Sequence, residues 1–126
     1  MQYLDAGLMT GKLYSIFLTL FDDEHIHTRE AVCSVCQKLR ISDKIVIDKL
    51  LQVVSYDVCS RIRAMAVRAL REICLAHKEV FDERIRSALV WSFKYETLPS
   101  MRSEACSTLV ALNLCLDTEV RPTFGG

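Results

Sequence analysis

An internal repeat constrains the fold of this chain more than any other feature of the sequence. In the segment Asp57 to Ile73, an acidic residue is followed after five residues by Ile62, and apolar residues then recur at the spacing of one helix face. The same arrangement begins 34 residues earlier at Asp23 and 39 residues later at Glu96. Each copy carries an arginine at the same position, giving Arg29, Arg63 and Arg102. A period of 34 to 39 residues is typical of stacked helical repeats.

The segment in front of each acidic residue also repeats, and it predicts a first helix in every unit. The positions that align without a gap include Ile16, Leu50 and Leu89. Ser42 and Asp43 are suitable caps for the first helix of unit two, and Asp82 is suitable for unit three. Pro99 fits the first turn of the last helix. Because only a few residues separate the two helices of a unit, they must be antiparallel.

These patterns predict an all-α fold, a right-handed α-solenoid of about three antiparallel helix pairs. The expected boundaries are units at about residues 12–40, 43–75 and 82–116, a single domain at 1–117 and a flexible tail at 118–126. The first and last helices of the array are apolar nearly all round. We therefore expect further repeats in a longer chain, or ends that stack on other molecules.

The pattern D-x5-[VI]-R-x2-A-x2-[AL]-L-x2-[LI], best kept in Asp57 to Ile73, resembles the second helix of a HEAT repeat. The resemblance extends over about Lys12 to Leu112. It implies a ladder of contacts between turn acids and arginines along the array. The matching positions are Asp23, Arg29, Asp57, Arg63, Glu96 and Arg102. The chain departs from the family pattern at Thr28 and Met101, where Val is usual, and at Glu96, where Asp is usual.

Composition narrows the class of protein further. The 126 residues include only four Gly and two Pro, which favours helices over a turn-rich β fold. No secretory signal and no membrane-spanning run is visible in the sequence. The six cysteines lie inside amphipathic segments of a chain with ample apolar residues. We therefore expect reduced thiols in an intracellular protein, either cytoplasmic or nuclear.

The stretch EHIHTREAVCSVCQ, residues 24–37, combines two histidines with C-x-x-C spacing, and a zinc site is one interpretation of it. Cys33 and Cys36, however, occupy positions that apolar residues fill in other units, while His25 and His27 fall in the preceding turn. We therefore expect buried thiols, no metal and no cofactor. We also expect no enzyme activity, because buried thiols are poor nucleophiles and the His-Glu dipeptides of HEAT-like hydroxylases are absent from the sequence.

Protein binding is the function that the predicted architecture favours, because a solenoid presents a long concave surface built by its second helices. The predicted partner-binding residues are Lys38, Arg68, Arg71, Glu72 and Ser107. Other positions expected to be exposed on this face are Glu30, Ser34, Ala64, Ser103 and Ala111. The alternative is a nucleic-acid backbone binder using Arg61, Arg68 and Arg71. Zero net charge and the interspersed glutamates disfavour it.

Overall fold

The computed structural model describes residues 11–120, with side chains described as far as residue 113. This part of the chain is helical and contains no strand. Its helices are α2 (Gly11–Thr19), α3 (Ile26–Leu39), α4 (Lys44–Tyr56), α5 (Ser60–Ala76), α6 (Glu83–Tyr95) and α7 (Pro99–Val120). Two short 3-10 turns, η1 (Leu20–Asp22) and η2 (Lys78–Val80), precede α3 and α6. The prediction of an all-α fold is confirmed.

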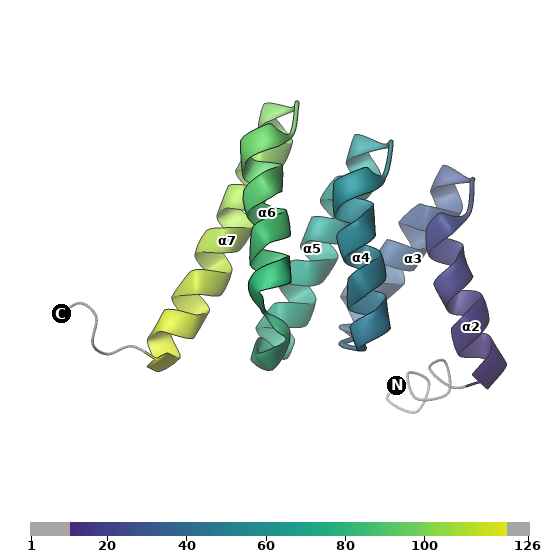
Figure 1. Ribbon diagram of the computed structural model, residues 1–126, viewed down its shortest axis with the longest axis horizontal. Coiled ribbons are helices and arrows are strands. Elements are labelled where there is room, and N and C mark those ends of the chain that lie inside the picture. The colour runs from purple at the N-terminus through teal and green to yellow at the C-terminus, as the bar shows by residue number, and fades with distance from the viewer. Residues whose placement is uncertain (1–10, 121–126) are drawn as a thin grey trace.

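The helices form two layers (Figure 1). The front layer contains α2, α4 and α6, and the rear layer contains α3, α5 and α7. In the rear layer α5 packs against both α3 and α7, and in the front layer α4 packs against α6. The layers are joined where α4 packs on α5 and α6 packs on α7. Successive helix pairs therefore lie side by side, each with one helix in either layer.

Local sequence signals explain where the helices begin and end. The Asp43 carboxylate accepts hydrogen bonds from two amides of the first turn of α4, and Asp82 caps α6 through one amide. Pro99 occupies the first position of α7. The predictions for these three residues are confirmed. Helix α3 ends at Leu39, and the next residue, Arg40, caps it in the left-handed conformation with φ of 49°.

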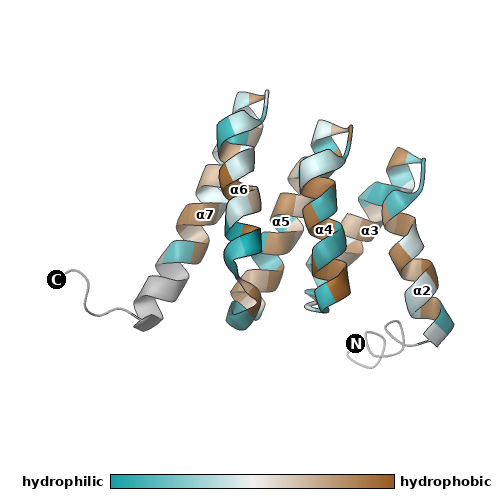
Figure 2. Ribbon diagram, in the orientation of Figure 1, coloured by the Kyte–Doolittle hydropathy of each residue, from teal (hydrophilic) through white to brown (hydrophobic). Residues whose placement is uncertain are grey.

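The core lies between the two layers and is most complete in the central unit. Hydrophobic and hydrophilic segments alternate along the helices, so that each helix has a face suited to burial (Figure 2). Fully buried residues of the central pair include Val46, Leu50, Val54, Ile62, Ala66, Leu70 and Ile73. This pair is covered on both sides, because α5 lies between α3 and α7.

Three residues are exposed or buried differently from what the repeat predicted. Ala64, expected on the exposed face of α5, is buried, because neighbouring helices on both sides cover a wide part of that helix. Ile16 aligns with the fully buried Leu50 but is 52% exposed, and Phe93 was aligned with core positions but is 44% exposed. Ile16 and Phe93 belong to the first and last units, where no further unit covers them within the described residues.

The last helix is longer than expected. Helix α7 ends at Val120, whereas the predicted domain ended at residue 117 and the predicted tail began at 118. No Gly or Pro lies between residues 113 and 121. The first stop signal is Pro122, because a proline disfavours the helical conformation of the residue before it. Residues 121–126 of the predicted tail lie outside the described residues, as do residues 1–10.

Candidate functional site

Arginines of α3 and α5 pair with acidic residues of the following unit. Arg29 donates hydrogen bonds from Nε and Nη2 to the two carboxylate oxygens of Asp57, at 2.7 and 3.1 Å. Arg63 makes the same two-pronged contact with Glu96, at 2.7 and 2.9 Å. In each case the arginine Nη1 donates to a backbone carbonyl in the turn of its own unit, that of Asp23 or of Asp57. Each arginine thus joins two successive turns.

Both pairs are largely shielded from solvent. The exposed side-chain fractions are 11% for Arg29 and 5% for Asp57, and 17% for Arg63 and 2% for Glu96. The hydrogen bonds to Asp57 raise the pKa of Arg29, and those to Glu96 raise the pKa of Arg63. Removing one member of such a pair leaves a poorly solvated charge without its partner. The pairs therefore fix how each unit sits on the next.

The ladder is open at both ends of the described chain. Arg102 donates from Nη1 to the backbone carbonyls of Glu96 and Thr97, and no carboxylate of the described residues lies within ion-pair distance of it. The Asp23 carboxylate accepts from the backbone amide of His25, and the His25 Nδ1 lies 2.8 Å from the same oxygen. These contacts lower the pKa of Asp23. No Arg or Lys of the described residues pairs with that carboxylate.

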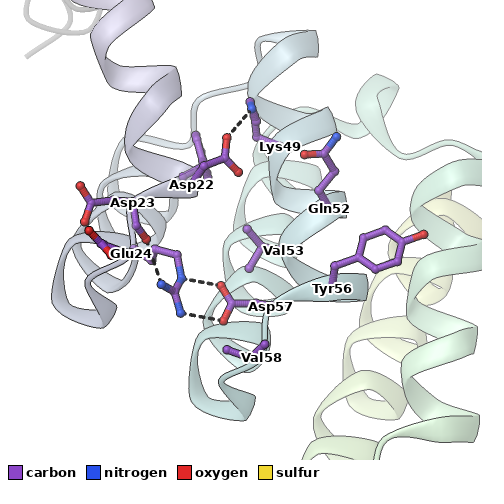
Figure 3. A pocket seen from close by; sticks show the side chains of 11 residues that line it. Asp22, Asp23, Glu24, Lys49, Gln52, Val53, Tyr56, Asp57 and Val58 are labelled. Carbon is purple, nitrogen blue, oxygen red and sulfur yellow. Dashed lines mark hydrogen bonds and ion pairs between the residues drawn. The ribbon is translucent and has the colours of Figure 1, made fainter.

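A pocket of about 420 Å³ lies between the turns of units one and two, beside the Arg29–Asp57 pair (Figure 3). The Asp23 and Glu24 side chains lie on the side of the pocket opposite Tyr56. Lys49 donates to Asp22 at 2.9 Å. Because the lysine and the arginine are both engaged by carboxylates, the pocket presents acidic and aromatic groups to solvent.

Ion pairs also join the helices of the rear layer. Arg40, just after α3, lies 3.6 Å from Glu72 of α5. Arg71 lies 3.6 Å from Glu72 and 3.8 Å from Glu104 of α7, and Arg68 lies 3.4 Å from Glu104. We call these five residues the rear-layer network. It connects the charged groups of three successive units across the outer face of α5.

The rear-layer network includes three of the five predicted partner-binding residues, namely Arg68, Arg71 and Glu72. The other two, Lys38 and Ser107, are exposed but stand apart from it. Lys38 borders a groove on α2 and α3, and Ser107 lies on α7. Arg61 lies 3.4 Å from Glu30. All three arginines of the nucleic-acid alternative therefore have a glutamate within ion-pair distance.

The histidines and cysteines at the start of the chain do not converge on one point. Cys33 and Cys36 are buried, and burial raises the pKa of both thiols, that of Cys33 to about 12. His27 lies in the first turn of α3 rather than before it, because the helix already begins at Ile26, and its side chain is 92% exposed. Among the described side chains, no three of the metal-binding types gather into a cluster.

The exposed tyrosines of the front layer were not among the residues that the sequence analysis singled out. Tyr56 and Tyr95, which end α4 and α6, are 81% and 63% exposed. The ring of Trp91 lies 5.9 Å from that of Tyr95. A groove of about 430 Å³ between α4 and α6 is lined by Tyr56 and Trp91 among others. The signal was present in the sequence, since a tyrosine directly precedes the ladder acid in both units.

No family model matches the chain, and no solved structure matches it. In the described part of the chain, no helix combines the length and the apolar character that crossing a membrane requires. The ladder and the rear-layer network are therefore the features that indicate a function.

Proposed function

We propose that this chain is a non-enzymatic protein-interaction module, a HEAT-like segment of a right-handed α-solenoid that binds a protein partner along a concave face formed by α3, α5 and α7. The side-by-side helix pairs support the solenoid assignment. The Arg29–Asp57 and Arg63–Glu96 pairs fall at the positions that the HEAT resemblance implies. We further propose a reducing compartment, cytoplasmic or nuclear, since the cysteines with described side chains are free thiols.

The rear-layer network is the observation that carries the proposed binding face. Its ion pairs have nitrogen–oxygen distances of 3.4 to 3.8 Å and are partly open to solvent, so each adds little to stability. A partner's charges can replace these contacts at small cost. The network meanwhile restrains the arginine side chains before binding, which lowers the entropy lost on association. Since both signs are present, the matching partner is a helix or extended segment that carries acidic and basic residues.

The same network favours a protein over a nucleic acid as the partner. Arg68 and Arg71 share Glu104 as their counterion, and Glu72 lies beside them. A phosphate backbone would have to approach these glutamates to reach the arginines. Zero net charge also provides no long-range attraction for a polyanion.

The double variant Arg68→Glu with Arg71→Glu tests this proposal by co-purification from native cells, with quantitation of each bound protein. Loss of a specific set of proteins from the variant is the expected result. The matched control is Lys44→Glu with Lys94→Glu, which makes the same change in net charge at exposed sites of the front layer. If both variants retain the set equally, the rear layer is not the binding face. Salt-sensitive retention of RNA or DNA by the wild type alone would instead support the nucleic-acid alternative.

A further inference from the structure

The outer face of unit one is an apolar groove of about 710 Å³ formed by α2 and α3. The groove is lined mainly by aliphatic and aromatic side chains, including Phe17, Leu20, Val32, Val35 and Leu39. Asp23 lies in the turn that joins these two helices. An exposed apolar surface of this kind commonly marks a site where another molecule binds.

The internal repeat shows what covers the same surface elsewhere in the chain. Val35 corresponds to Ala69 and Thr108 in the second and third units, and these two residues are fully buried. In those units the second helix packs against that of the preceding unit, as α5 does on α3 and α7 does on α5. Val35 itself is only partly buried. The groove is therefore the continuation of the interface that already joins the units.

The front-layer helix of unit one, α2, is also more exposed than its counterparts in the other units. Ile16 is 52% exposed, whereas the corresponding Leu50 and Leu89 are fully buried. Leu13, one turn earlier, is 58% exposed, and its counterpart Ile47 is buried. The positions that the repeat uses for stacking are thus open along both helices of unit one.

The charges at this face match the same interface. Asp23 occupies the position of Asp57 and Glu96, each of which accepts two hydrogen bonds from an arginine of the preceding unit. The Asp23 side chain is 32% exposed, against 5% for Asp57 and 2% for Glu96. Within the described residues, Asp23 is therefore a ladder acceptor without the arginine that pairs with its counterparts.

The opposite end of the chain supplies the complementary group. Arg102 occupies the position of Arg29 and Arg63, but among the described residues it donates only to backbone carbonyls of its own turn. Phe93 of α6 is 44% exposed, while the corresponding Val54 of the middle unit is fully buried. This end therefore offers an apolar surface together with an unused ladder arginine.

We propose that the groove on α2 and α3 binds the α6–α7 end of a second copy of this chain, with Arg102 of one copy donating to Asp23 of the next. The groove needs an apolar surface to cover it, and Asp23 needs an arginine. A second copy supplies both, since its α6–α7 end carries exposed apolar side chains and Arg102. The contact joins two different surfaces, so each copy retains one free end and association continues beyond a dimer unless the array closes.

Sedimentation velocity of the full chain over a wide concentration range tests the proposal. The weight-average sedimentation coefficient should rise steadily with protein concentration rather than level off at the value of a dimer. Asp23→Asn keeps the acceptor of the His25 amide but removes the charge. Because removing one partner of a desolvated charge pair leaves the other charge without its counterion, the association constant should fall at least about thirtyfold. Arg102→Gln should have a similar effect.

Exchanging the charges at positions 23 and 102 tests whether the two side chains contact each other, because damage to the fold alone would not be repaired by combining the two substitutions. Asp23→Arg and Arg102→Asp should each prevent association, and the double variant should restore it, because Arg at position 23 then meets Asp at position 102. Ile16→Glu should also prevent association, whereas Ile45→Glu, at an exposed isoleucine of α4, should not. Thermal unfolding confirms that each variant is folded. A chain that stays monomeric throughout overturns the proposal, as does association that is unaffected by Ile16→Glu or not restored in the double variant.

Discussion

The guanidinium of Arg29 and the carboxylate of Asp57 form two hydrogen bonds across the boundary between units one and two. Nη1 of the same arginine donates to the backbone carbonyl of Asp23. One side chain thus ties the turn of its own unit to the turn of the next. The contact is repeated by Arg63 at the next boundary, so the spacing of the helix pairs is set by polar contacts at the turns as well as by the core.

Asp57→Asn should destabilise the fold by about 3 kcal/mol, which is the cost of leaving one member of a shielded ion pair without its partner. Asn keeps an oxygen that can accept from the Cys59 amide, as the aspartate does at 2.9 Å, so the turn itself is preserved. The measurement is urea unfolding followed by circular dichroism, with the free energy extrapolated to water.

The control for this experiment is Asp22→Asn, which breaks the exposed pair with Lys49 in the neighbouring turn. The Asp22 side chain is 68% exposed, so the change in unfolding free energy should stay within about 0.5 kcal/mol. Equal effects of the two substitutions would show that the ladder pair contributes no more than a surface pair.

Arg40→Gly should stabilise the protein by roughly 0.5–1 kcal/mol. Arg40, the residue after α3, has a φ of 49°, a conformation that strains residues with a Cβ but not glycine. The gain is smaller than the full strain, because glycine also has more freedom to lose on folding. Lys38→Gly, within the same helix, should instead destabilise by about 1 kcal/mol. Thermal melts of both variants test the prediction, and a loss of stability in both would contradict it.

Thr108→Val should stabilise the protein by about 1 kcal/mol. The Thr108 hydroxyl is buried and has no hydrogen-bond partner among the described residues, so it loses its hydration on folding without compensation. Val has nearly the same shape. Thr19→Val is the control, because the exposed Thr19 hydroxyl already donates to the Ile16 carbonyl at 2.7 Å. A gain at Thr19 equal to that at Thr108 would point to a general effect of valine.

Stability should fall as pH rises above about 8.5, where thiols of the unfolded chain begin to ionise. Burial raises the pKa of Cys33 and of Cys74 to about 12, and it raises the pKa of Cys36 as well. Between the unfolded and folded values, the folded state keeps protons that the unfolded state loses. Ionisation therefore favours unfolding, and this contribution to stability is fully present only below the unfolded pKa.

Cys33→Val should reduce this alkaline loss while keeping the core filled, since Val67 occupies the same position in unit two. The measurement is the unfolding free energy from pH 7 to pH 10 for the variant and the wild type. The two curves should diverge by up to about 1.4 kcal/mol per pH unit once the unfolded thiol is ionised. Parallel curves over this range would contradict the prediction.

The sequence by itself determined the helices and their order. The spacing of apolar residues located all six, and the capping residues Asp43 and Asp82 and the helix-starting Pro99 fixed three of the starts. These features depend on contacts within a few residues of each other, so they can be read from a short window of sequence. The last boundary was predicted three residues too early, since the tail carries no stop signal before Pro122.

Only the tertiary structure decided which side chains are covered and which charges meet. Ile16 and Leu50 hold the same place in the repeat, yet one is half exposed and the other is buried, because burial depends on whether a neighbouring unit is present. Asp23 and Asp57 likewise share one position, but Arg29 reaches the carboxylate of the second and only the carbonyl of the first. Helical periodicity specifies the apolar face of each helix, whereas the packing of one unit on another determines what that face and its flanking charges contact.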